Sequence, residues 1–250
     1  MLSHKRRAAA LAALFWLAVW HIASVLVGND ILLVSPLAAL TRLFEMALTP
    51  WFWSSAAFSL LRIMGGFFSA LAAGTLLAVA AARFPLVKAL LAPLTGAAKA
   101  VPVASYTILL LVFLRARSLS FIIAFLMILP IVYDTLSEGL RNTDRKLLEM
   151  AKVFRVPPLR RLRSIYIPQI LPYLISAVGV GVGIAWKSGV AAEVIGLPQG
   201  SVGSRLYEAK LFLDMRGLFA WTVAVMLLCA GLEKLTLWLI KRAARALERM

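Results

Sequence analysis

The sequence has little of what disulfide-bonded domains, metal centres and soluble folds require. Its 250 residues include one cysteine, Cys229, and two histidines, His4 and His21. A single cysteine excludes an intramolecular disulfide and a multi-cysteine metal site, and we expect Cys229, inside an apolar run, to be a small buried hydrophobe. Charged residues make up 15% of the chain, whereas about 25% is usual in soluble domains. The sequence offers no catalytic cluster and no metal site.

Apolar residues dominate instead. Hydrophobic residues make up 62% of the chain, and the mean hydropathy is +0.90. This composition predicts an all-α, polytopic membrane protein. The net charge of +16 is compatible with nucleic-acid binding only if the basic residues gather on a soluble face. Here they fall between apolar runs, so we expect membrane lipid, and no nucleic acid, as a partner.

The apolar runs predict six transmembrane helices in one domain, residues 1–250. A helix needs about twenty apolar residues to cross the hydrocarbon core. Small residues in the second span, among them Gly66 and Gly74, favour close packing between helices. Pro102 should kink or break the third span, because proline removes a backbone hydrogen bond and clashes with the preceding turn. The six spans cover about residues 8–27, 60–82, 92–114, 120–136, 170–192 and 218–240.

One polar stretch, residues 137–168, interrupts this pattern. It carries 8 Lys or Arg against 3 acids, too many charges for hydrocarbon. Apolar residues recur at helical spacing over 146–154, which predicts a short amphipathic helix ended by Val156-Pro157-Pro158. With the N-terminus inside, the inner segments hold 17 Lys or Arg and the outer segments 6. This excess places both termini and the polar stretch in the cytoplasm.

The polar stretch resembles a motif of a known family, the inner-membrane permease subunits of ATP-binding-cassette (ABC) importers. Their EAA loop reads E-A-A-x3-G-x9-I-x-L-P. Glu149, Ala151, Ile165 and Pro168 match it at the same mutual spacing, whereas Met150, Arg155 and Ile167 stand where the motif has alanine, glycine and leucine. The segments SLLRI, AWK and AAEVIG look like the branch of nitrate, sulfonate, taurine and thiamine-precursor permeases. The resemblance covers essentially the whole chain and implies a type I importer permease fold in the bacterial cytoplasmic (inner) membrane.

The resemblance also implies partners. Two ATPase subunits would bind ATP and Mg, so we expect no cofactor in this chain and no enzymatic activity of its own. Further partners would be a second permease copy, expected to be identical, and a periplasmic or lipid-anchored binding protein that delivers the solute. Glu149 would contact an ATPase arginine, and the turn after the coupling helix would form at Arg155 or through Val156-Pro157-Pro158. The residues expected in ATPase coupling are Leu147, Leu148, Glu149, Met150, Ala151, Phe154, Arg155 and Pro168.

A charged residue inside a span suggests contact with the solute. Lys187 lies in the outer half of the fifth span, beside Trp186 and six residues before Glu193. An ionisable residue at this depth is a functional candidate, and with Pro102 these residues form our predicted pathway set. The alternatives for Lys187 are a pair with Glu193 or a side chain that reaches the outer surface.

Two other functions remain possible from the sequence. A secondary transporter of a small anion predicts internal repeats and coupling-ion residues, and the chain shows no convincing repeat. A membrane-embedded enzyme needs clustered polar residues in the spans, and the chain has only two histidines.

Overall fold

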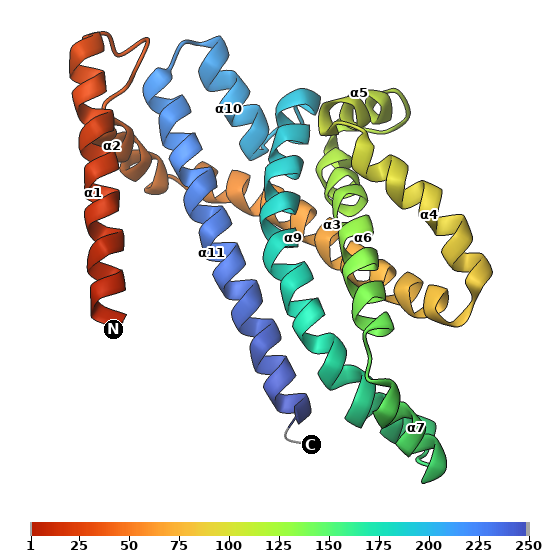
Figure 1. Cartoon of the computed structure of the whole chain (residues 1–250). Coiled ribbons are helices and arrows are strands. Elements are labelled where there is room, and N and C mark those ends of the chain that lie inside the picture. The colour runs from red at the N-terminus through yellow and green to blue at the C-terminus, as the bar shows by residue number, and fades with distance from the viewer. Residues whose placement is uncertain (1, 249–250) are drawn as a thin grey trace.

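The computed structural model describes the backbone of residues 2–248 and the side chains of residues 7, 8 and 11–242. Within this part of the chain every regular element is a helix (Figure 1), as the composition predicts. The elements in order are α1 Leu2–Val27, α2 Pro36–Ala47, α3 Pro50–Arg83, α4 Pro85–Ala100, α5 Val103–Phe113, α6 Ala116–Arg141, α7 Arg145–Val153, α8 Pro158–Arg161, the π-helical turn η1 Leu162–Tyr166, α9 Ile167–Gly196, α10 Val202–Leu211 and α11 Met215–Glu248.

The centre of the molecule is α6, which packs along both α3 and α9. Phe67, Ile128 and Val182, one from each helix, are fully buried in the core. The small residues of α3 let the backbones approach, because a Cβ at Gly66 would lie 2.1 Å from the carbonyl oxygen of Phe121. This contact confirms the prediction that the second span packs against other helices.

Pro102 breaks the third predicted span. Helices α4 and α5 meet at Val101 and Pro102 with a bend of 105°. Pro102 is the residue immediately before α5, where a missing N–H costs no intrahelical hydrogen bond. The break that the sequence predicts is therefore present, and it takes the form of a sharp reversal in direction.

The mixed segments outside the spans form short helices at one end of the molecule. Ser35 caps α2, since its hydroxyl accepts a hydrogen bond of 3.3 Å from the backbone N–H of Ala38. Arg42 of α2 lies 3.4 Å from a carboxylate oxygen of Asp214, just before α11. Helix α10 begins with a buried turn at Val202 and is described with the site below.

Four described helices are long and apolar enough to cross a membrane, namely α3, α6, the continuous run from α8 to α9, and α11. The bent pair α4 and α5 makes a fifth candidate if it counts as one span, and α1 contributes a shorter apolar stretch, Leu11–Val27. The protein is thus a multi-pass membrane protein, and the count of six spans stays a prediction.

Figure 1 shows α7 and the marked C-terminus toward the lower end of the molecule, with α2, α5 and α10 toward the upper end. This arrangement fits the expected grouping of the polar stretch with the basic tail. The cytoplasmic assignment stays a prediction, and the side chains of Lys5, Arg6, Arg245 and Arg249, which enter the charge count, lie outside the described residues.

Candidate functional site

The amphipathic helix predicted over residues 146–154 is α7, Arg145–Val153. Asp144 caps it, because its carboxylate accepts a hydrogen bond of 2.8 Å from the backbone N–H of Lys146. The backbone N–H of Asp144 in turn donates to the side-chain oxygen of Gln169 at 2.8 Å. This second bond joins the start of α7 to the first turn of α9, so the short helix is anchored to a long one.

Helix α7 buries little of its apolar surface. Ala151 is buried and fixes the helix against the rest of the chain. Leu147, Met150 and Phe154 are exposed, and Phe154 has 74% of its surface accessible. Glu149 is exposed beside them. Such an apolar surface around a carboxylate, at the tip of a membrane protein, is typical of a protein-binding site.

Arg155 itself makes the turn that ends α7. Its φ of +49° lies in the left-handed region, where glycine is normally found. The backbone N–H of Arg155 donates to the carbonyl of Lys152 at 3.1 Å, and that of Val156 donates to Ala151 at 2.9 Å. This pair of bonds is the Schellman ending of a helix. The glycine geometry of the motif is therefore kept with an arginine, and Val156-Pro157-Pro158 follows the turn.

We expect Arg155→Gly to strengthen this turn and Arg155→Val to weaken it. A non-glycine residue in the left-handed conformation costs about 1–2 kcal/mol, and a β-branched residue fits it worst. Hydrogen exchange of the α7 amides should become slower in the glycine variant and faster in the valine variant. The matched control is Arg160→Gly in α8, where φ is not positive. Glycine destabilises a helix at such a position, so the α8 amides should exchange faster in this variant. Equal exchange in both Arg155 variants would contradict this account.

The end of the motif lies at the entry to α9. Ile165 is buried within the π-helical turn η1, and Pro168 is the second residue of α9. Because α8, η1 and α9 form one continuous helical run, Pro168 lies inside that run, two residues after the π-helical turn, and its missing N–H leaves one backbone carbonyl without its usual donor. The matched positions from Glu149 to Pro168 thus form one structural unit. It consists of a short helix, the turn after it and the beginning of the long helix α9.

Glu193, predicted to lie in the pathway, is fully buried near the other end of α9. Its Oε2 accepts hydrogen bonds from the Ser59 hydroxyl at 2.6 Å and from the backbone N–H of Gly203 at 3.3 Å. The Ser59 hydroxyl also accepts from the backbone N–H of Val202 at 2.9 Å. One carboxylate therefore joins α3, α9 and the first turn of α10. Gly203 is required here, because a Cβ would lie 2.4 Å from the Cβ of Glu193.

The other predicted pathway residues are separated in this structure. Trp186 is fully buried and donates to the carbonyl of Val225 at 3.0 Å. Lys187 is exposed on α9 and does not pair with Glu193, whose partners are Ser59 and Gly203. Pro102 lies at the bend before α5. No described contact brings these side chains into one site, and their role in the pathway stays a prediction.

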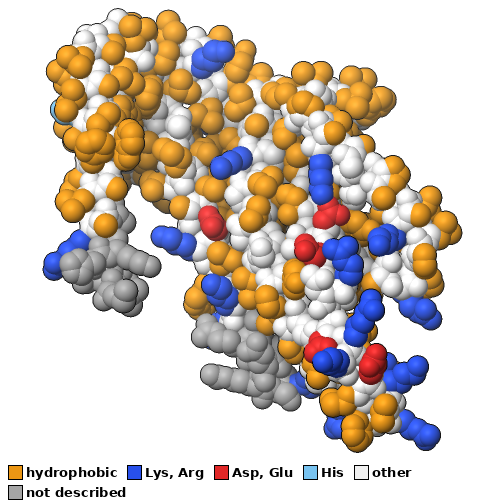
Figure 2. Space-filling view, viewed as in Figure 1, with side chains coloured by type: hydrophobic (Ala, Val, Ile, Leu, Met, Phe, Trp, Pro, Cys, Tyr) orange, Lys and Arg blue, Asp and Glu red, His pale blue; other side chains and the backbone are white. Residues whose placement is uncertain are grey.

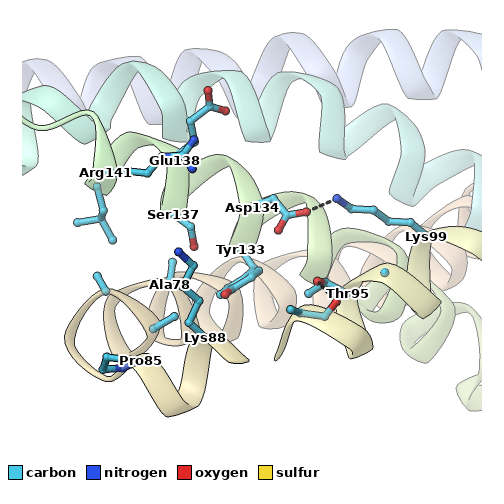
Figure 3. A pocket seen from close by; sticks show the side chains of 15 residues that line it. Ala78, Pro85, Lys88, Thr95, Lys99, Tyr133, Asp134, Ser137, Glu138 and Arg141 are labelled. Carbon is cyan, nitrogen blue, oxygen red and sulfur yellow. Dashed lines mark hydrogen bonds and ion pairs between the residues drawn. The ribbon is translucent and has the colours of Figure 1, made fainter. Parts of the chain in front are cut away.

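Sequence reasoning missed a polar cavity between α3, α4 and α6 (Figure 3). Lys99 of α4 forms an ion pair with Asp134 of α6. The cavity has a volume of about 790 Å³. The signal available in the sequence was Asp134, an acid within the fourth predicted span, for which a partner should have been sought.

Comparison with known families decides the class. Residues 70–245 match the family described as "Binding-protein-dependent transport system inner membrane component". The chain belongs to this family. The match contains α7, the turn at Arg155 and the start of α9, so the resemblance noted in the sequence, to ABC importer permeases, is confirmed.

Individual relatives share less than a third of their residues with this permease over the aligned segments. The taurine transport system permease protein of Escherichia coli (strain K12) is 25% identical over 89% of this chain and 82% of its own. The putative aliphatic sulfonates transport permease protein of Bacillus subtilis (strain 168) is 25% identical over 82% of this chain and 74% of its own. A probable ABC transporter permease protein of Brucella melitensis biotype 1 is 29% identical over a segment that spans 39% of each chain.

Proposed function

We propose that the chain is the transmembrane permease subunit of an ATP-driven importer in the bacterial inner membrane. Family membership supports this role, and the single structural observation that carries it is α7. The helix is capped at Asp144, ended by a defined turn at Arg155, and leaves Leu147, Met150 and Phe154 uncovered. A partner that covers this surface would be held rigidly to α9 through Gln169.

The partner that fits α7 is a cytoplasmic ATPase subunit. The exposed apolar residues would enter a groove, and Glu149 would pair with an arginine, since a carboxylate and a guanidinium form strong charge-assisted hydrogen bonds. Two such subunits would serve two permease copies, most simply two copies of this chain. ATP and Mg would be bound by the ATPase, and this chain would carry out no covalent chemistry.

The solute would be a small organic or inorganic anion, such as a sulfonate, or a vitamin precursor. Relatives are named for taurine, aliphatic sulfonates and bicarbonate, and the sequence resembles the branch that also contains nitrate and thiamine-precursor permeases. A binding protein outside the membrane would deliver the solute. ATP binding and the loaded binding protein would then shift the permease between inward-open and outward-open states, because each favours one of the two states.

Reconstitution tests this proposal directly. The tagged chain, expressed with the ATPase encoded beside it, should copurify with that ATPase and, in proteoliposomes with the binding protein, should take up solute only when ATP is present. A secondary transporter would instead take up solute without the ATPase and without ATP. Uptake that follows an ion gradient, without the ATPase and without ATP, would overturn the proposal.

A further inference from the structure

The cavity between α3, α4 and α6 holds charged residues on helices that are candidates for membrane spans. Asp134 lies on α6 about 10 Å along the helix axis from Arg141, the last residue of that helix. Lys99 lies on α4, two residues before the bend at Val101 and Pro102. A charge in a membrane-spanning segment is costly, and such residues face a cavity or a partner and mark solute pathways. Here they do both, since they pair across the cavity.

Small side chains on the walls of the cavity leave its interior unfilled. Helices α3 and α4 contribute mostly alanine and glycine, and α4 has no buried residue among those described. The polar side chains therefore stand over small residues with free volume between them. A volume of about 790 Å³ lies within the range of about 300–1,000 Å³ that is usual for small-molecule sites. The lining residues with polar or charged side chains are Lys88, Thr95, Lys99, Tyr133, Asp134, Ser137, Glu138 and Arg141.

One polar atom in this cavity lacks a partner. The Oγ of Ser137 is buried and makes no hydrogen bond within the described part of the chain. In Figure 3 the Ser137 side chain and the Lys88 side chain point toward each other across the cavity, on the same side of α6 as Asp134. A buried hydroxyl without a partner costs free energy unless a ligand or water bonds to it. Ser137 thus marks where a ligand would gain hydrogen bonds.

The charges define the ligand's class. With Lys99 paired to Asp134, one positive charge remains in excess in the cavity, because Lys88 and Arg141 stand against Glu138 alone. A simple anion that took Lys99 would leave Asp134 unpaired beside it, and a simple cation would leave Lys99 unpaired. A small molecule with both an oxoanion and an ammonium group can replace both halves of the internal pair at once, so that neither charge is stranded.

We infer that this cavity is the site at which the permease binds a small zwitterion, with the oxoanion on Lys99 and the ammonium group on Asp134. The inference rests on the proposed function, because it assigns a solute class to that transporter. The oxoanion would also accept hydrogen bonds from the Ser137 hydroxyl and from Lys88. Figure 2 shows that the charged side chains on this face gather over α4, the lower part of α6 and α7, whereas the upper part is mostly hydrophobic.

Cysteine labelling can test the site in the intact permease–ATPase complex. Cys229 is the chain's one cysteine, so Cys229→Ser gives a background on which Ala82→Cys, on the α3 wall, reports from the cavity and Ser118→Cys, an exposed position at the start of α6, reports from outside it. The probes are taurine, an aminosulfonate zwitterion, and 2-hydroxyethanesulfonate, which has the same sulfonate but no ammonium group. An anionic methanethiosulfonate reagent labels the cysteine. If Ala82→Cys fails to assemble, Ala92→Cys on the α4 wall replaces it.

Taurine at roughly ten times its Kd should slow labelling of Ala82→Cys about tenfold, because only the ligand-free fraction reacts. 2-Hydroxyethanesulfonate should protect far less, and neither compound should change labelling of Ser118→Cys. Adding Asp134→Asn should remove the preference for taurine while the cysteine stays reactive. If Asp134 only holds α4 to α6, this substitution will change the ligand-free rate and leave the preference intact, which would overturn the inference.

Two further outcomes separate this inference from the proposed function. Equal protection by both compounds, or none by taurine, in a complex that still performs ATP-driven uptake would overturn the zwitterion site alone. A complex that shows no ATP-driven uptake at all would overturn the proposed function, whatever the labelling shows.

Discussion

Replacing Glu149 with Lys is expected to abolish ATP-driven uptake and to release the ATPase from the permease. Glu149 is exposed on α7 beside the uncovered apolar residues. If it pairs with an arginine of the ATPase, the substitution places two positive charges together. Loss of a buried charge pair at an interface costs about 2–5 kcal/mol, or roughly 30-fold or more in affinity. The fraction of ATPase that copurifies with the tagged permease measures this loss.

Two variants make this result specific. Glu149→Gln keeps the shape without the charge and should give an intermediate loss of ATPase. Glu45→Lys changes the net charge equally at α2, where Glu45 forms an exposed pair with Arg42, and should leave ATPase binding unchanged, because exposed pairs contribute about 0–1 kcal/mol. Normal ATPase recovery and normal uptake in the Glu149→Lys variant would show that α7 is not the docking helix.

Local pattern was sufficient to predict α7 to within one residue at each end. The helical spacing of its apolar residues, the capping Asp144 and the prolines after Arg155 all act within a few residues of each other. The same holds for the break at Pro102 and for the packed second span with Gly66. In each case the physical cause lies in the segment itself, so the sequence carries it.

The turn at Arg155 shows where a motif and a residue disagree. A missing glycine favours a different turn, but the backbone bonds to Ala151 and Lys152 form regardless. These two bonds hold the exposed Arg155 in the left-handed conformation despite the free-energy cost of that conformation. Conformational propensity predicts which residue is preferred at a left-handed position. The surrounding structure decides whether the backbone adopts the left-handed conformation there.

Contacts between distant segments could not be predicted. Lys99 and Asp134 are 35 residues apart and meet only when α4 packs on α6. Ser59 and Glu193 are 134 residues apart and meet only when α3 packs on α9. The structure shows that Glu193 joins α3, α9 and α10, and its role in the pathway stays a prediction.

Glu193→Ala is expected to destabilise the end of the molecule at which α3, α9 and α10 meet. The substitution removes the acceptor for the buried Ser59 hydroxyl and the Gly203 N–H. It also leaves a void where a fully buried side chain stood. Each of the two buried donors left without a partner costs about 1–3 kcal/mol, so a total loss of about 2–6 kcal/mol should lower the thermal unfolding midpoint of the purified protein by roughly 4–24 °C.

The matched control for this prediction is Glu208→Ala in α10. Glu208 pairs with Arg205 at 2.9 Å, but its side chain is 46% exposed, and loss of such a surface pair should cost less than about 1 kcal/mol. Glu193→Gln distinguishes two forms of the carboxyl group. It keeps an oxygen that can accept from Ser59 and Gly203, so a stability close to that of the unchanged protein means that a neutral acceptor is enough. A loss as large as that of Glu193→Ala means that the charge itself holds α3, α9 and α10 together, and no loss in either variant would rule out Glu193 as their junction.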